Sequence, residues 1–208
     1  MQITARANRL ALRRERLRLL DTNLPTLAQQ SRSSRTTRAV SDLVMGGVMI
    51  LTGFLVPPGT PSRYWIWGYG AAQTAGGIVG FVWAPAVETE TSQYLHMPFA
   101  RGRERRARVR FGERALEDMA ADAARRRYLG GVGSIGLPLA LTGIVYADPL
   151  FNGRPFVPST FDVLFIALTG AQIVLAVYEL FVPSPVERFR GMYQQQVAMR
   201  RAELFGQP

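Results

Sequence analysis

The chain of 208 residues contains no cysteine, one histidine and, among its 25 basic residues, no lysine. The absence of cysteine excludes a disulfide framework, a thiolate metal site and a cysteine nucleophile. With every basic residue an arginine, the composition indicates a genome rich in G and C, and we expect a bacterial source. The missing residue types leave few options for catalysis.

Other catalytic and metal-binding patterns are equally sparse. His96 has no second histidine or paired carboxylate at ligand spacing, so it does not predict a metal site. Gly130, Gly131 and Gly133 have the composition of a phosphate-binding loop, but no lysine follows them and no strand is expected before them. No serine lies in a GxSxG setting. We expect a protein that is not an enzyme and has no metal and no cofactor.

Long apolar runs are abundant instead, and they form four blocks. These are Ala39–Val56, Tyr64–Val87, Tyr128–Ala147 and Phe161–Val182. The last block has about 22 residues, which as a helix is about 33 Å long and suffices to cross a hydrocarbon core of about 30 Å. Its only charged residues are Asp162 and Glu179, one near each end. The blocks predict an all-α integral membrane protein with four transmembrane helices in two tandem helical hairpins.

The positive charge is distributed unevenly along the chain. A net charge of +10 in a soluble domain would suggest nucleic-acid binding. Here only Arg63 and Arg154 fall in the two predicted outer loops, which orients both termini toward the cytoplasm. An arginine-rich start also fits a mitochondrial transit peptide, but Glu15 and Asp21 favour a bacterial mature terminus. We therefore expect a multi-pass protein of the bacterial inner membrane whose arginine clusters meet anionic headgroups, with no nucleic-acid partner.

Polar stretches flank the apolar blocks. We expect a basic amphipathic helix and linker at 1–38, hairpins at 39–87 and 128–183, a charged helical segment at 88–127 and a C-terminal helix at 184–208. Ile3, Leu10 and Leu17 recur every seven residues, so this helix can lie on the inner leaflet or pack on another cytoplasmic helix. The polar segment Thr22–Thr37, which contains Pro25, predicts a connector.

The charged middle segment predicts a helix from about Glu113 into the third apolar block, because helix-forming residues dominate there. Glu117 lies at helical spacing from Arg114, and Asp122 from Arg125 and Arg126. These charges indicate either a solvated face or a docking surface, for a cytoplasmic partner or for the basic N-terminal helix.

The two predicted hairpins show weak similarity to each other. Gln172 aligns with Gln73 at an offset of 99 residues, and Leu141–Gly143 aligns with Leu51–Gly53 at an offset of 90. Because each hairpin has two spans, both copies enter the membrane from the same side. The pattern predicts a parallel internal repeat about an axis along the membrane normal.

Small residues mark the surfaces where spans are expected to pack. Ala72, Gly76 and Gly80 recur every four residues in the second block, and a stripe of this kind lets another helix approach closely. Gly136 and Gly143 occupy the third block. We predict that these five residues mediate helix packing.

Three polar residues lie within the apolar blocks. Gln73 and Gln172 could form an interhelical hydrogen bond or line a shared polar site. Glu179 lies about 5 Å from the inner end of its helix, where it can reach the interface, pair with an arginine or border a polar path. Thr52 and Thr142 are expected to bond to the backbone of their own helices.

Two functions remain open. The first is a non-enzymatic structural or interaction protein of the inner membrane, an accessory subunit, assembly factor or anchor that contacts other membrane subunits or itself. The alternative is a small channel or transporter that acts as a homo-oligomer, with Gln73, Gln172 and Glu179 near its path. An enzyme acting on lipid would need a catalytic cluster that the sequence does not contain.

Overall fold

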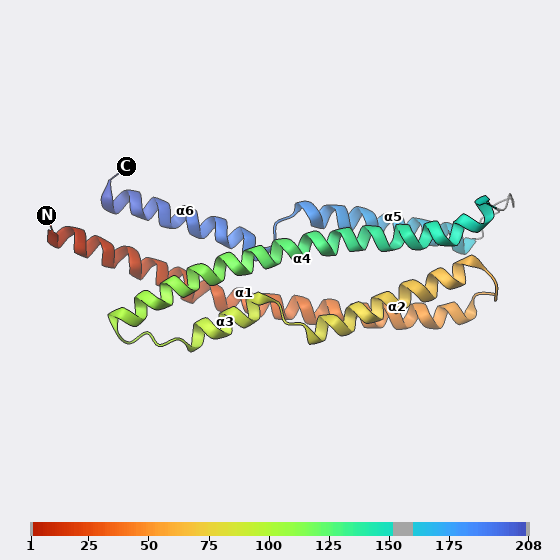
Figure 1. Cartoon of the computed structure of the whole chain (residues 1–208), viewed down its shortest axis with the longest axis horizontal. Coiled ribbons are helices and arrows are strands. Elements are labelled where there is room, and N and C mark those ends of the chain that lie inside the picture. Colours follow the sequence, from red (N-terminus) through yellow and green to blue (C-terminus); the bar gives the residue numbers. More distant parts are fainter. Residues whose placement is uncertain (1, 152–159, 207–208) are drawn as a thin grey trace. The chain divides into compact units, whose positions relative to one another are not determined.

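The computed structural model describes residues 2–151 and 160–206, and the described residues are almost entirely helical (Figure 1). The helices are α1 (Gln2–Leu55), α2 (Pro61–Val82), α3 (Ala86–His96), α4 (Gly102–Phe151), α5 (Thr160–Phe181) and α6 (Pro185–Phe205). No strand is present in these ranges. The all-α prediction is confirmed.

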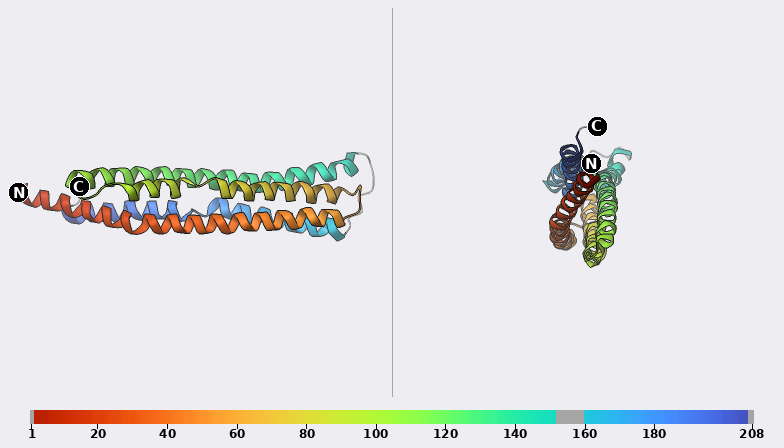
Figure 2. Two further views of the ribbon diagram at one scale, coloured as in Figure 1. Left: turned by 90° about the horizontal axis from the view of Figure 1, so that it is seen from below. Right: turned by 90° about the vertical axis from the view of Figure 1, so that its left-hand side faces the viewer.

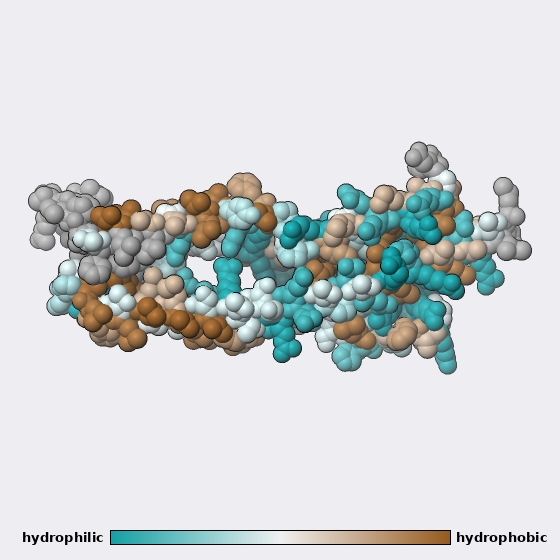
Figure 3. Space-filling view, turned by 180° about the vertical axis from the view of Figure 1, so that it is seen from behind, coloured by the Kyte–Doolittle hydropathy of each residue, from teal (hydrophilic) through white to brown (hydrophobic). Residues whose placement is uncertain are grey.

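The helices form two compact units. The first, which we call the polar unit, comprises Met1–Ser33, Ala84–Arg125 and Pro183–Pro208. The second, the apolar unit, comprises Ser34–Trp83 and Arg126–Val182. The long helices α1 and α4 contribute residues to both units. Figure 3 shows mostly hydrophobic surface over the apolar unit and mostly hydrophilic surface over the polar unit.

The polar unit has a core of its own, made by α3, α6 and the first halves of α1 and α4. Leu20, Leu24, Tyr94 and Met119 are fully buried there. Full burial of a side chain of this size contributes about 1.5–3 kcal/mol. The start of α1 and the end of α6 lie at the same end of this unit, where the Asn8 amide donates to the Leu204 carbonyl (Figure 2). These residues therefore form a helical bundle with a continuous apolar interior.

Helix α6 begins where the sequence predicts, because Ser184 and Glu187 form a capping box at its first turn. The Ser184 hydroxyl accepts from the Glu187 amide at 3.2 Å, and the Glu187 carboxylate accepts from the Ser184 amide at 2.7 Å. Pro185 occupies the first helical position, where its missing N–H has no helical partner to lose.

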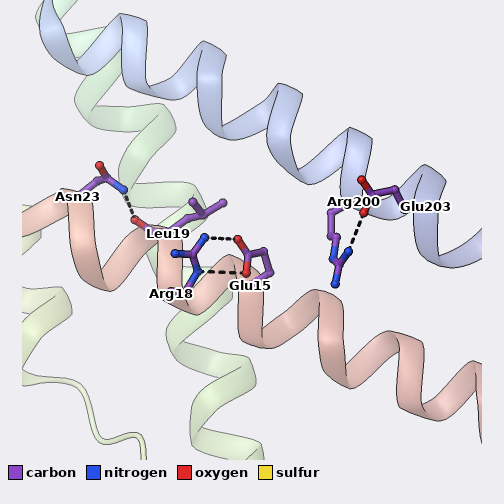
Figure 4. Close-up of polar contacts among 6 residues, drawn as sticks. All are labelled: Glu15, Arg18, Leu19, Asn23, Arg200 and Glu203. Carbon is purple, nitrogen blue, oxygen red and sulfur yellow. Dashed lines mark hydrogen bonds and ion pairs between the residues drawn. The ribbon is translucent and has the colours of Figure 1, made fainter.

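Short ion pairs lie along the exposed faces of α1 and α6 (Figure 4). The guanidinium of Arg18 contacts the Glu15 carboxylate at 2.6 Å, and that of Arg200 contacts Glu203 at 2.6 Å. The hydrogen bond from Arg18 holds the pKa of Glu15 below its usual value. Exposed pairs of this kind contribute little to stability, so they indicate a solvated surface rather than a site.

The predicted connector at Thr22–Thr37 is wrong, because α1 continues through it. Pro25 has no N–H, so one helical hydrogen bond is missing at this point. In the turn before it, the Asn23 side-chain amide donates to the Leu19 carbonyl at 2.8 Å (Figure 4). Leu24 and Leu27 are buried in the core. Burial on both sides of the proline outweighs the lost hydrogen bond and keeps the segment helical.

Two further helix boundaries differ from the prediction. Helix α2 ends at Val82 instead of Val87, because Pro85 disfavours a helical conformation in the residue before it. Helix α4 begins at Gly102, well before Glu113, and extends past Ala147 to Phe151. Most of the predicted second outer loop, including Arg154, lies outside the described residues. The predicted fourth span agrees with α5 to within one residue at each end.

The apolar unit consists of α2, α5 and the second halves of α1 and α4. A connection of five residues, Val56–Thr60, joins α1 to α2, and Gly59 adopts a positive φ of 83° within it. Within the described residues, two helical stretches, Thr4–Leu55 and Thr169–Phe205, are long and apolar enough to cross a membrane by length and composition.

Candidate functional site

The apolar unit contains a cavity of about 360 Å³ to which all four of its helices contribute. Its polar lining consists of Arg38, Asp42, Tyr69, Gln73, Ser134, Gln172 and Glu179. We call it the polar cavity. Figure 3 shows an opening bordered by hydrophilic surface in this unit. The three polar residues singled out in the sequence, Gln73, Gln172 and Glu179, all line it.

Tyr69 connects the two glutamines. The Gln73 amide donates to the Tyr69 hydroxyl at 2.6 Å, and the Gln172 side chain is also hydrogen-bonded to Tyr69. The Gln172 Oε1 atom is buried and has no hydrogen-bond partner in the described structure. The glutamines thus meet through a tyrosine rather than directly, and one buried acceptor remains available to a ligand.

A loosely paired arginine and glutamate border the cavity. An Nη atom of Arg38 lies 3.9 Å from the Glu179 carboxylate, and the two side chains are 65% and 54% exposed. At this distance and exposure the attraction contributes about 0–1 kcal/mol. Glu179 therefore pairs with an arginine, which is one of the roles its position predicts.

Asp42 is the second carboxylate of the polar cavity. It follows Arg38 by one helical turn, so both side chains project from the same face of α1. Among the described residues, no hydrogen bond or ion pair reaches its carboxylate. Asp42 is half-buried, so its charge is costly unless a partner compensates it.

An aromatic cluster closes the cavity beyond Tyr69. The Trp65 and Tyr69 rings are stacked, with centroids 5.2 Å apart and planes at 6°, and they pack with Val56 and Ile66. The Trp65 indole donates to the Thr142 hydroxyl at 3.3 Å. A second, smaller space is lined by Ser62, Trp65 and Thr142 among others, and it has no room for a water molecule. Tyr69 therefore belongs both to the lining of the polar cavity and to this aromatic cluster.

Sequence reasoning missed several of these residues. Asp42 is one charge in an otherwise apolar run, and Tyr69 is one of four aromatic residues near a predicted membrane boundary. A usable signal existed, because Tyr69 lies four residues before Gln73 and so shares its helix face. Thr52 donates to the Val48 carbonyl of its own helix as predicted, whereas Thr142 accepts from Trp65.

The glycines that permit close helix contact are only partly those of the predicted stripe. A Cβ on Gly77 would lie 2.8 Å from the Ala39 carbonyl oxygen, and one on Gly80 would lie 3.1 Å from the Ala39 Cβ. Ala72 lines the polar cavity. Cβ atoms on Gly76, Gly136 and Gly143 would meet nothing within 4 Å among the described residues. Their packing role stays a prediction.

A groove of about 1290 Å³ crosses α1, α4 and α6 in the polar unit. Its basic lining residues are Arg16, Arg110, Arg114 and Arg201, and we call it the arginine groove. Arg16 pairs with Glu113 at 3.1 Å. The other three arginines have no ion pair among the described residues. The apolar side chains of Val197 and Phe205 line the same groove, so it combines positive charge with apolar surface.

One predicted charge pair is replaced by a contact with another helix, and Asp122 makes an additional contact with α3. Glu117 pairs with Arg190 of α6 at 3.1 Å instead of Arg114. The Asp122 carboxylate accepts from the Ala86 amide at the start of α3 at 3.3 Å. These contacts join α4 to α6 and α3, and the docking of a cytoplasmic partner on this helix stays a prediction.

Two clusters of tyrosine, carboxylate and arginine lie among the helices of the polar unit. In the first, Asp21 accepts from the Tyr94 hydroxyl at 2.8 Å and pairs with Arg108 at 2.9 Å. In the second, Glu113 accepts from the Tyr193 hydroxyl at 2.7 Å and pairs with Arg16. Burial raises the pKa of both tyrosines, and the neighbouring carboxylates raise it further. Both hydroxyls therefore stay protonated and act as donors.

His96 makes only a local contact, in which its Nδ1 lies 2.6 Å from the Ser92 carbonyl oxygen. Among the described residues, no three histidine, aspartate or glutamate side chains come together in a way that could hold a metal ion.

Comparison of the chain with protein-family models, with curated proteins and with solved structures gives no match.

Proposed function

We propose that the chain is a non-enzymatic structural or interaction protein of the bacterial inner membrane, with the apolar unit as four membrane spans in two hairpins. The observation that carries this proposal is the outward exposure of apolar side chains on every helix of that unit. Examples are Leu55 at 85%, Val82 at 81%, Leu129 at 59% and Phe181 at 80%. Soluble monomers rarely expose contiguous apolar surface of this kind, whereas hydrocarbon tails would cover it favourably.

In this proposal the polar unit lies in the cytoplasm together with both termini. The distribution of arginines supports that orientation, because the positive-inside rule places arginine-rich segments on the cytoplasmic side. Anionic headgroups would attract arginines near the membrane by about 1 kcal/mol each. A reporter enzyme fused after Pro208 should be active in the cytoplasm, and activity only outside it would overturn the orientation.

Matching contacts support a parallel internal repeat. The Arg35 guanidinium donates to the Phe81 carbonyl at 3.0 Å, and that of Arg127 donates to the Leu180 carbonyl. The two arginines are 92 residues apart and the two acceptors 99 residues apart. In the polar unit, Asp21 and Glu113 are also 92 residues apart, and Tyr94 and Tyr193 are 99 residues apart. Two copies of one helical unit would account for all of these coincidences.

The arginine groove is the surface that we assign to the partner. Arg110, Arg114 and Arg201 face it without ion pairs in the described structure, and Asp118 is the one carboxylate there without a hydrogen bond or ion pair. The groove therefore has an excess of positive charge beside the apolar side chains of Val197 and Phe205. An acidic amphipathic helix of another membrane subunit would satisfy both features.

Purification in mild detergent, with mass measurement of the intact particle, tests this role. A stoichiometric second protein is expected with the wild-type chain. The triple variant Arg110→Glu/Arg114→Glu/Arg201→Glu should lose it. A triple variant of exposed arginines outside the groove, Arg9→Glu/Arg103→Glu/Arg188→Glu, carries the same charge change and should retain it. Equal loss in both variants, or no second protein with the wild type, would contradict the proposal.

The polar cavity favours a second candidate function, a small channel or transporter that acts as a homo-oligomer. Its polar groups come from all four helices of the apolar unit, which is the arrangement expected around a solute path. If transport occurs, liposomes containing the protein should show a solute flux that Glu179→Gln abolishes while the amount of folded protein is unchanged. A flux unaffected by that substitution would exclude Glu179 from the path.

A further inference from the structure

We propose that the polar cavity binds a small organic cation that carries an ammonium or guanidinium group. The inference goes beyond the interaction role above, because it concerns a ligand held inside the apolar unit and requires no partner protein. Asp42 is the counter-charge for this cation, and the Gln172 side-chain oxygen is the additional hydrogen-bond acceptor.

The charge balance of the cavity favours a positive ligand. Its lining contains one cation, Arg38, and two anions, Asp42 and Glu179. Arg38 lies 3.9 Å from Glu179 and also attracts Asp42 electrostatically, but the half-buried carboxylate of Asp42 has no ion pair or hydrogen bond among the described residues. A half-buried carboxylate is unfavourable without a partner, and a bound cation would supply one.

The hydrogen-bonding groups of the cavity point to the same class of ligand. The Gln172 Oε1 atom is buried without a donor, and the Asp42 carboxylate accepts no hydrogen bond in the described structure. The Gln73 amide is already directed at the Tyr69 hydroxyl at 2.6 Å. The cavity therefore offers the Asp42 carboxylate and the Gln172 oxygen as acceptors for a ligand that carries N–H donors. Ammonium and guanidinium groups provide several N–H donors and no acceptor, so they complement this lining.

The size and the apolar lining favour an organic cation over a metal ion. About 360 Å³ lies at the lower end of the range for small-molecule pockets. Leu137 and Leu175 are among the apolar residues that line it and would contact the alkyl part of a ligand. No group of three acidic or histidine ligands suited to a metal occurs in the described part of the chain.

The cavity also has a defined route of entry. Stacked Trp65 and Tyr69 close it on one side, while Arg38 and Glu179, both more than half exposed, border it on another. A contact of 3.9 Å between exposed groups is weak enough to open for a ligand. The cation would therefore enter past Arg38 and Glu179 and stop at Tyr69.

Calorimetric titration of the full-length protein in detergent at constant ionic strength tests the proposal, with n-butylamine and agmatine as probes. Both should bind saturably, and n-butanol and butyrate should not. Asp42→Asn should weaken amine binding at least tenfold. Gln172→Leu, which removes the amide oxygen together with the bond to Tyr69 but no charge, should weaken it several-fold. Absence of saturable amine binding to the wild type would overturn the proposal.

Two controls separate a specific effect from a general loss of charge. Asp118→Asn makes the same chemical change in the arginine groove and should leave amine binding unchanged. Glu203→Gln removes an exposed carboxylate of α6, outside the cavity, and should likewise leave amine binding unchanged. Undiminished binding in Asp42→Asn, or displacement of the amines by an equal concentration of sodium, would overturn the assignment.

The outcome is independent of the partner experiment. Amine binding is measured on the purified chain, and its variants lie outside the arginine groove. Loss of a partner protein in the groove variant with no amine binding would leave only the interaction role. Amine binding without any partner would leave only the ligand site. If Asp42→Asn does not fold, as judged by its helical circular dichroism and particle mass, Gln172→Leu decides the question.

Discussion

Tyr94 and Tyr193 lie 99 residues apart and make the same kind of bond, each donating its phenol hydrogen to a carboxylate of a long helix. Tyr94 of α3 donates to Asp21 of α1, and Tyr193 of α6 donates to Glu113 of α4. Each carboxylate also pairs with an arginine of the other long helix. The two short helices of the polar unit are thus bonded to the long ones through partly buried, charge-assisted hydrogen bonds.

Tyr94→Phe should destabilise the polar unit by about 1 kcal/mol, because it removes a hydrogen bond from a buried phenol to the half-exposed Asp21 carboxylate without opening a large cavity. Native-state hydrogen exchange along α3 measures the effect as a lower free energy of opening. Tyr128 is exposed, and Tyr128→Phe should change the value by less than about 0.5 kcal/mol. A Tyr94→Phe protein as stable as the wild type would show that the bond contributes nothing.

The raised pKa values of Tyr94 and Tyr193 predict a loss of stability in alkali. Below about pH 10 both the folded and the unfolded chain keep the phenol protons, so the stabilisation is fully present. Above that pH the unfolded chain releases them first. The free energy of unfolding should then fall by about 1.4 kcal/mol per pH unit for each tyrosine until the folded pKa is reached.

Urea unfolding of the full chain in detergent, followed by circular dichroism between pH 8 and 11, measures this slope. The double variant Tyr94→Phe/Tyr193→Phe should show a shallower decline above pH 10 than the wild type. Identical pH profiles would mean that other groups cause the alkaline loss.

Local signals were sufficient to predict α5 and α6. The apolar block is continuous from Phe161 to Val182, and Pro185 marks the start of the next helix together with Glu187. Thr22–Thr37 was misread because its composition and Pro25 are those of a loop. Only packing against distant residues of α3, α4 and α6, which buries Leu24, reveals why it is helical. That information does not lie in the segment itself.

The candidate site was predictable to a similar degree. Alignment of the two hairpins pairs Gln73 with Gln172, and both residues line one cavity. Asp42 and Tyr69 could not be assigned to it, because their roles depend on which helix faces meet. A single sequence fixes the faces of each helix but not the contacts between helices, so the cavity became visible only in three dimensions.

Gly77 and Gly76 should respond very differently to substitution. Gly77→Leu is expected to disrupt the apolar unit, because even its Cβ would lie 2.8 Å from the Ala39 carbonyl oxygen. Gly76→Leu should leave the fold of the chain intact, since its Cβ would meet nothing within 4 Å. Particle mass and helical circular dichroism of the purified variants measure the difference. If Gly76→Leu keeps the fold but changes the mass of the particle, Gly76 packs against a separate chain.

Arg108 should not be replaceable by lysine. Its guanidinium donates to the Asp21 carboxylate and to the Met97 carbonyl, both at 2.9 Å, and lies 4.4 Å from the centroid of the Tyr94 ring. A lysine ammonium is a compact charge that cannot reproduce this planar, forked arrangement, and Arg108 is buried. Solvent screens part of the ion pair because Asp21 is half-exposed, but lysine would also lose the bond to the Met97 carbonyl and the contact with the Tyr94 ring.

Urea unfolding of Arg108→Lys in detergent, compared with the exposed control Arg110→Lys, measures this loss. We expect about 2–3 kcal/mol for Arg108→Lys and less than about 0.5 kcal/mol for Arg110→Lys. Hydrogen exchange should also rise around Met97, because the donor to its carbonyl would be gone. Equal stabilities of the two variants would show that charge alone, rather than the geometry of the guanidinium, holds α1, α3 and α4 together at this point.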